Sequence, residues 1–251
     1  MPFYGGLRTN FKRDAMLIRI TAEGGLTGYG PGPGSDRAQS VIQSQIGPFL
    51  TGRDCRNPEA LRSAFESEVN PDSGVRKLYG GVELALYDLA GKANGVPASE
   101  LLGGRVRDRI KLYGSAGMYQ SPEGYAAEAA AIVGMGFPAY KMRPAAGPDA
   151  DVETVRQMRR AMGEGPGLMV DAHAWWRMGD RSYSWNTVRD VAKEMAAYGM
   201  TWLEEPLPPE DHDAYRKLRA EGVVAVASGG HEQSDANSRD VRRTGCVEYG
   251  P

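Results

Sequence analysis

From about Arg109 onward the chain alternates short apolar runs with helical patterns, and this repeat constrains the fold more than any other feature of the sequence. Apolar runs begin near Ile110, Pro138, Gly167, Thr201, Val223 and Cys246. Strands that alternate with helices form a parallel sheet, and many such units in one chain favour a barrel over an open sheet. We count five complete units and the start of a sixth, whereas a closed barrel needs eight.

Helical patterns fill the gaps between these runs, over 122–133, 151–162, 186–198 and 211–220. Asp151 is expected to cap the second of these helices, because an aspartate oxygen accepts hydrogen bonds from the free N–H groups of a first turn. The loops 144–150 and 175–185 are long. Long loops at these places are expected if an active site lies at the C-terminal ends of the strands.

The first part of the chain is organised differently. A strand over 17–22, a Glu-Gly-Gly turn and a short return strand predict a hairpin. Helices are expected near 36–50, 58–67 and 75–94, and Gly95 with Pro97 ends the last of them. The glycine-rich stretch 28–34 is interpreted as a turn-rich loop, without the strand and helix that a dinucleotide site needs around its glycines. We place the boundary between the two parts after residue 104.

The composition excludes several classes of protein. The 30 basic and 32 acidic residues nearly balance, so neither nucleic acid nor a membrane is expected as a partner. Cys55 and Cys246 have no metal-like spacing and are expected to be reduced thiols. The N-terminus lacks the apolar core of a signal peptide, and no apolar run approaches the length of a membrane span. We expect a soluble cytoplasmic protein.

Acidic residues follow three consecutive apolar runs of the repeat. Asp171 ends one run, Glu204 ends the next, and the segment Gly-Gly-His-Glu at 229–232 follows the third. If the runs are neighbouring parallel strands, these groups converge at one end of the sheet, and carboxylate oxygens suit a hard cation such as Mg²⁺. Glu205 is expected to point away from such a site, because adjacent strand residues face opposite sides.

The third ligand position is the unusual one. Gly230 has no side chain to offer. Glu232 lies on the same face as Gly230 if the strand continues, so it could replace a ligand there. His231 is a weaker choice, since imidazole matches Mg²⁺ poorly. The alternative is a solvated loop acid beside a two-carboxylate site.

The segments GGVELALYDLAGKANGVPASELLGG, YKMR, LMVDAH, WLEEPLPPED and ASGGHE, in this order and at these spacings, resemble the mandelate racemase/muconate-lactonizing branch of the enolase superfamily. The resemblance runs from about Leu17 to the last residue. It implies an α/β fold in which an N-terminal α+β capping domain, here 1–104, covers a (β/α) barrel of the modified TIM type, here 105–251. Mg²⁺ would hold a substrate carboxylate while a base removes the α-proton. Compared with this family the chain resembles an incomplete barrel, truncated at both ends.

Lys141 and Arg143 lie two residues apart on the second strand, so both are expected at the barrel mouth. They resemble the Lys-x-Lys motif of the family, whose second lysine is a base. A guanidinium is an inefficient base but a good clamp for a carboxylate, so Arg143 is assigned to binding and charge stabilisation. Lys141 is the candidate acid or base if the site depresses its pKa. The competing interpretation of the pair is an ion-paired strand end.

His173 follows Asp171 by two residues. The Asp-x-His arrangement resembles that of acid-sugar dehydratases in the family, where the histidine donates a proton to the departing β-hydroxyl. A histidine is suited to this near neutral pH, although a hydrogen bond to substrate is the alternative role. Trp175, Trp176 and Tyr183 follow in the same loop and are expected to pack rather than bind.

The sequence therefore predicts a Mg²⁺-dependent acid-sugar dehydratase, a hydro-lyase of carbohydrate acid catabolism, with Lys141, Arg143 and His173 catalytic and Asp171, Glu204 and Glu232 as metal ligands. A racemase, epimerase or cycloisomerase using the same enolisation is the second possibility. The third is an inactive fragment, because an open barrel exposes strand edges and apolar faces. The expected partners are a sugar acid and, in the full-length form, further copies of the chain.

Overall fold

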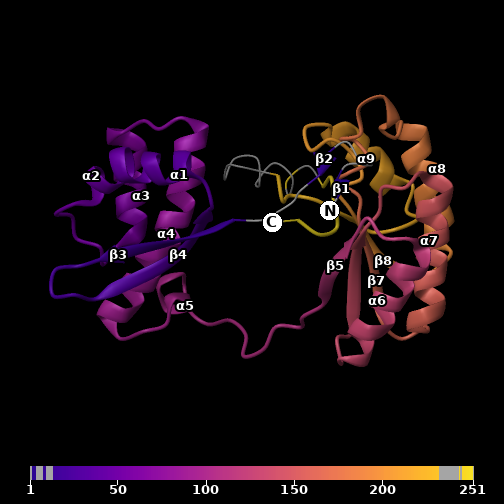
Figure 1. Ribbon diagram of the computed structural model, residues 1–251, viewed down its shortest axis with the longest axis horizontal. Coiled ribbons are helices and arrows are strands. Elements are labelled where there is room, and N and C mark those ends of the chain that lie inside the picture. Colours follow the sequence, from indigo (N-terminus) through magenta and orange to yellow (C-terminus); the bar gives the residue numbers. More distant parts are fainter. Residues whose placement is uncertain (1, 4–7, 10–13, 232–242, 244, 251) are drawn as a thin grey trace. The chain divides into compact units, whose positions relative to one another are not determined.

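The computed structural model describes residues 2–3, 8–9, 14–231, 243 and 245–250, and its contacts divide the chain into two units (Figure 1). One unit spans 12–110, and the other combines 1–11 with 111–251. The second unit includes a short antiparallel pair, β1 (Pro2–Phe3) and β2 (Arg8–Thr9). None of the described helices is both long enough and apolar enough to cross a membrane.

The 12–110 unit is built on a hairpin, as predicted. Strand β3 (Ala15–Thr21) pairs antiparallel with β4 (Thr27–Pro33). The interpretation of 28–34 as a loop was wrong, because most of this stretch forms β4. A Cβ atom on Gly28 would lie 2.2 Å from the carbonyl oxygen of Ala85, and one on Gly30 would lie 2.4 Å from that of Gly81. These glycines therefore let the strand approach the backbone of a helix.

The helices of this unit follow the hairpin closely in sequence. They are α1 (Asp36–Val41), the π-helical η1 (Ile42–Ile46), α2 (Gly47–Leu50), α3 (Pro58–Glu68), α4 (Ser73–Asn94) and α5 (Ala98–Leu101). Asp72 caps α4, and Gly95 ends it in the left-handed region with a φ of 69°. The core between the hairpin and α4 includes Ile46, Phe65 and Leu86, which are at most 1% exposed.

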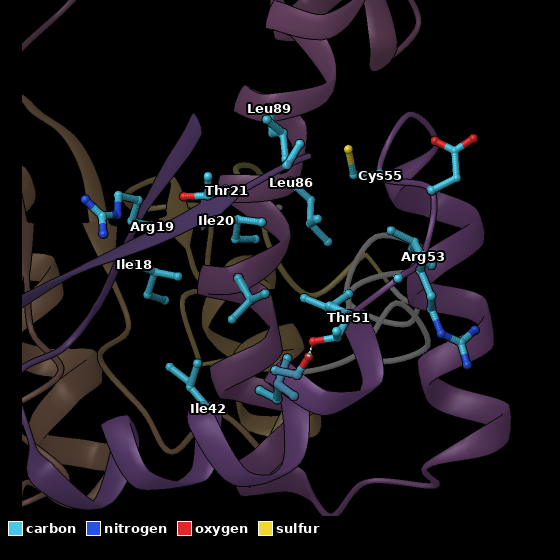
Figure 2. Close-up of a pocket in the computed structure, with 18 of the residues that line it drawn as sticks. Ile18, Arg19, Ile20, Thr21, Ile42, Thr51, Arg53, Cys55, Leu86 and Leu89 are labelled. Carbon is cyan, nitrogen blue, oxygen red and sulfur yellow. Dashed lines mark hydrogen bonds between the residues drawn. The ribbon is translucent and has the colours of Figure 1, made fainter. Parts of the chain in front are cut away.

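A cavity of about 820 Å³ lies beside β3 in this unit. Ile18 and Ile20 of β3 and Leu86 and Leu89 of α4 are among its apolar lining residues (Figure 2). All of its lining residues belong to the 12–110 unit. It is therefore distinct from the strand ends that the sequence predicts as the active site.

A five-stranded parallel sheet forms the centre of the second unit. Its strands follow chain order: β5 (Gly114–Met118), β6 (Ala139–Arg143), β7 (Gly167–Asp171), β8 (Met200–Glu204) and β9 (Val226–Ala227). The predicted parallel α/β architecture is confirmed. Within the described residues, the run at Cys246 contributes a single parallel bridge, Ala227 to Tyr249, in place of the sixth strand expected there.

The connecting helices are α6 (Pro122–Gly134), α7 (Pro148–Met162), α8 (Trp185–Ala196) and α9 (His212–Ala220), with a 3₁₀ turn η2 (Gly179–Arg181) before α8. Helices α6, α7 and α8 lie along one face of the sheet (Figure 1). Tyr140, Met142, Leu168 and Val170 are fully buried in the core on this face. Because side chains alternate along a strand, Lys141 and Asp171 point to the opposite face.

The start of α7 differs from the prediction. The helix begins at Pro148 with Gly147 as its N-cap, so the prediction of Asp151 as the cap was wrong. Proline is favoured at the first helical position, because the N–H that it lacks has no partner within the helix there. Asp151 lies in the first turns of α7 instead, and its side chain is buried.

Candidate active site at the strand ends

Three of the predicted site residues come together at the C-terminal ends of neighbouring strands. Asp171 and Glu204 are the last residues of β7 and β8 and are paired in the sheet register. Lys141 of β6 lies with its Nζ atom 2.6 Å from Glu204 Oε1 and 3.6 Å from Asp171 Oδ2. Lys141 and Asp171 are only 6% and 4% exposed. The lysine ammonium therefore interacts with both carboxylates.

Arg143 and His173 complete the contacts of Asp171. Arg143 Nε donates to Asp171 Oδ2 at 2.9 Å. His173 Nδ1 lies 2.7 Å from the other oxygen, Oδ1. His173 belongs to a turn after β7, which ends at Asp171. The carboxylate of Asp171 thus holds a lysine, an arginine and a histidine at once.

These contacts shift two pKa values in opposite directions. Burial alone would raise the pKa of Asp171, but His173, Arg143 and Lys141 hold that pKa well below its ordinary value. Burial disfavours the charged form of Lys141. Its hydrogen bond to Glu204 and the charges of Asp171 and Glu204 nevertheless raise its pKa above the ordinary value. These contacts therefore do not lower the pKa of Lys141, which would have to be lowered for Lys141 to act as a base.

Glu205 is placed differently from the expectation of strict alternation. Its φ is 47°, in the left-handed region that non-glycine residues rarely occupy. Its amide donates to the carbonyl of Ala227 at 2.8 Å, and its side chain is buried. Glu204 and Glu205 both border one hollow of about 210 Å³, which Gly230 also lines. The alternation of an extended strand therefore stops at Glu204.

The third ligand position is only partly described. A Cβ atom on Gly230 would lie 3.0 Å from Glu205 Oε1, so that carboxylate borders the space where a side chain at 230 would begin. His231 Nδ1 lies 2.8 Å from Glu205 Oε2, and its Nε2 lies 2.7 Å from Arg177 Nη2. Glu232 lies outside the described residues. Among the residues that are described, no three carboxylate, histidine or cysteine side chains gather as a metal cluster.

The residues present nevertheless suit Mg²⁺ as a cofactor. Mg²⁺ keeps several of its waters and is commonly held by one or two carboxylates together with substrate oxygens. Asp171 and Glu204 supply two carboxylates on neighbouring strand ends. The Lys141 ammonium beside both of them shows that this position already accommodates a positive charge.

Loop 172–184, which carries His173, is anchored by contacts that the sequence did not predict. The Trp176 indole donates to the carbonyl of Glu205 at 3.0 Å, and the Arg177 guanidinium lies 4.2 Å from the centre of the Trp176 ring. Trp175 is fully buried and stacks on Tyr183, which agrees with the packing role expected for both. Sequence reasoning missed Arg177, and it considered His231 only as a weaker metal ligand and not as a partner of this loop. Their contact spans 54 residues along the chain, and no local pattern signals it.

Two protein-family models match this chain. Residues 1–103 match the family model described as the mandelate racemase/muconate lactonizing enzyme N-terminal domain. Residues 124–249 match the model described as the enolase C-terminal domain-like family. A D-galactarolactone cycloisomerase from Agrobacterium fabrum is 28% identical over 91% of this chain and 60% of its own length. The chain thus spans about three fifths of that relative.

Two solved structures show the same fold. The 3,6-anhydro-D-galactonate cycloisomerase from Zobellia galactanivorans has a TM-score of 0.79 at 26% identity, over 92% of this chain and 64% of that one. A mandelate racemase/muconate lactonizing enzyme-like protein from Rubrobacter xylanophilus has a TM-score of 0.81 at 27% identity, over 93% and 64% of the two chains.

Proposed function

Because the chain belongs to the mandelate racemase/muconate lactonizing branch of the enolase superfamily, we propose that it acts on a sugar acid with Mg²⁺ as cofactor. The reaction removes the proton α to the carboxylate and expels the β-hydroxyl as water. The resulting enol becomes a 2-keto-3-deoxy acid. The observation that supports this best is the group of Lys141, Asp171 and Glu204 at adjacent strand ends, with Arg143 and His173 on the same aspartate.

The chemical difficulty of this reaction is the negative charge that develops when the α-proton is removed. Loss of a proton next to a carboxylate gives a dianionic enediolate, which needs positive charge on its oxygens. Mg²⁺ held by Asp171 and Glu204 would supply part of that charge when bound. Lys141 and Arg143 supply the rest from β6, in a site where Lys141 is almost entirely shielded from water. Arg143 binds rather than abstracts, since a guanidinium stays protonated. Lys141 would act as a base only where bound cations depress its pKa.

His173 is the proposed general acid for the leaving hydroxyl. Its Nδ1 faces Asp171 Oδ1 at 2.7 Å, which fixes the ring orientation. The proton given to the hydroxyl would therefore leave from Nε2. Imidazole is suited to this transfer near neutral pH.

The relatives favour a second candidate, cycloisomerisation. Two of the similar proteins are named as cycloisomerases of sugar-derived acids or lactones. Such a reaction uses the same first step, the removal of the α-proton, and differs in the fate of the enediolate. A racemase or epimerase would return a proton to the same carbon. A third possibility is that this chain, at about three fifths of the length of its relative, is inactive.

One experiment separates these outcomes. The chain is incubated with Mg²⁺ and a panel of aldonates, aldarates and their lactones in ²H₂O, and the products are followed by NMR. A 2-keto-3-deoxy acid supports dehydration, deuterium at C2 without a keto product supports racemisation or epimerisation, and a ring-isomerised product supports cycloisomerisation. Asp171→Asn should abolish all of these, whereas the exposed Asp149→Asn should not. A folded wild-type chain that neither exchanges nor converts any of these acids would contradict the proposal.

A further inference from the structure

The carboxylate of Asp151 is the most deeply buried acid outside the strand-end group among the described residues. Asp151 is 1% exposed. Its Oδ1 accepts a hydrogen bond from the backbone amide of Ala146 at 2.9 Å. Its Oδ2 accepts from Trp175 Nε1 at 2.9 Å and from the Tyr183 hydroxyl at 2.8 Å. Three donors from two loops therefore meet on a single side chain.

Both loops come directly from the strand ends of the candidate site. Ala146 lies in the loop between Arg143, which ends β6, and α7; this loop is shorter than the predicted 144–150 because α7 begins at Pro148. Trp175 and Tyr183 belong to loop 172–184, which follows Asp171. The amide of Tyr183 donates to the carbonyl of Trp175 at 2.8 Å. Asp151 therefore binds this loop where its first and last parts are hydrogen-bonded to each other. His173 lies two residues before Trp175 in the same loop.

We propose that Asp151 is a positioning residue whose carboxylate joins the loop after β6 to the loop after β7 and thereby fixes His173 beside Asp171. The inference rests on the proposed function only in giving His173 a chemical role. The hydrogen bonds by which Asp151 joins the two loops do not depend on the function of the protein.

A carboxylate is the group that this position requires. All three partners present hydrogens, and a carboxylate accepts at both oxygens. An asparagine has one accepting oxygen and one NH₂ group. In one amide orientation the NH₂ group faces the N–H of Ala146, and in the other it faces the N–H of Trp175. Tyr183 can turn its hydroxyl into an acceptor, but neither N–H group can.

The surroundings of Asp151 act on its pKa in two opposing directions. Burial raises its pKa to about 6, while the hydrogen bonds from Ala146, Tyr183 and Trp175 act in the opposite direction. Among the described residues, the titratable groups that interact with this cluster include Tyr125 of α6, the hydroxyl of Tyr183 itself and Asp149 of α7. The ionised form, which accepts all three hydrogen bonds, is therefore the main form at neutral pH.

The test compares Asp151→Asn with Asp149→Asn, which makes the same change of charge at an exposed position of the same helix turn. The chain has four tryptophans and three histidines, so each indole N–H and each imidazole can be assigned by NMR with single substitutions such as Trp175→Phe. In Asp151→Asn we expect a shifted Trp175 indole signal, roughly tenfold or more faster exchange of that N–H with solvent, and a shifted His173 signal, with His212 of α9 unchanged. Asp149→Asn breaks none of the hydrogen bonds of Asp151 and should therefore shift these signals much less than Asp151→Asn does.

Unchanged Trp175 and His173 signals in Asp151→Asn would overturn the inference. If that variant does not fold, Tyr183→Phe replaces it, because it removes one donor and keeps the ring that stacks on Trp175. Tyr183→Phe should shift both signals in the same directions by smaller amounts, and no shift in either would again overturn the inference. Neither readout depends on turnover. A failure of the proposed reaction would leave these signals as they are and is distinguishable from a failure of this inference.

Discussion

At the scale of single residues, two buried aspartates show opposite responses to their surroundings. Asp171 lies among Lys141, Arg143 and His173, and its pKa is held well below the ordinary value. Asp151 has neutral donors as its hydrogen-bond partners, and burial raises its pKa to about 6. The ionised form of Asp171 is therefore stabilised by folding, whereas the ionised form of Asp151 is penalised by it.

The raised pKa of Asp151 should make the free energy of unfolding depend on pH. The raised pKa of Asp151 contributes stability that is fully present below its unfolded pKa and is lost as the pH rises through about 6. At 1.36 kcal/mol per pKa unit, a shift of about two units corresponds to about 3 kcal/mol. The free energy of unfolding of the wild type relative to Asp151→Asn should therefore fall by up to that amount between pH 4 and pH 7. Urea unfolding at several pH values measures it, and a constant difference between the two proteins would refute the pKa shift.

Asp171→Asn should destabilise the fold at neutral pH. The substitution leaves Lys141 and Arg143 with a weaker partner in a largely buried site, and removing one partner of a buried charge pair typically costs about 3–5 kcal/mol. Since Arg143 is partly exposed, we expect the low end of this range. Thermal unfolding measures the loss. A melting temperature within about one degree of the wild type would show that the ion pairs of Asp171 do not stabilise the fold.

At the scale of elements, the hairpin was predicted correctly, and close backbone approach explains why its second strand was taken for a loop. The hairpin of β3 and β4 was predicted from the apolar alternation of β3 and the glycine turn. The glycines of β4 were interpreted as a loop, because the sequence does not reveal that α4 lies against that strand. Gly81 of α4 faces the strand in the same way: a Cβ atom there would lie 2.4 Å from the carbonyl oxygen of Pro31.

The neighbouring glycines of α4 provide a matched pair. Gly81→Ala should destabilise the protein by about 1–3 kcal/mol, since the methyl group would push the hairpin away from the helix. Gly80→Ala meets nothing within 4 Å and should stabilise the protein by about 0.5–1 kcal/mol through the better helix propensity of alanine. Chemical unfolding of the two variants compares them. Equal effects of the two substitutions would show that the hairpin does not lie against α4.

The sequence predicted the part of the site that lies at the ends of the strands. Lys141, Asp171 and Glu204 come together because β6, β7 and β8 are parallel neighbours, which the strand–helix repeat already indicated. The placement of Glu205 was not predictable, since it depends on a left-handed φ after the strand ends. Asp151 was expected at a helix cap and instead binds two loops, because its partners lie 5 to 32 residues away along the chain. The role of Glu232 as a ligand stays a prediction.

At the scale of the whole molecule, the described chain consists of two units with separate cores. The strand-end site and both of its loops belong to the unit that contains 111–251. This chain spans about three fifths of the length of its curated relative.

We propose that Asp171 and Glu204 form a divalent-cation site to which Gly230 contributes no ligand. Titration calorimetry with Mg²⁺ tests it on the wild type, Asp171→Ala, Gly230→Glu and, as a control for crowding at Glu205, Gly230→Ala. We predict that the wild type binds, that Asp171→Ala does not, and that Gly230→Glu binds more tightly than Gly230→Ala because it adds a third carboxylate. Equal binding by the folded wild type and Asp171→Ala, or no binding by any folded variant, would contradict a cation site at Asp171 and Glu204.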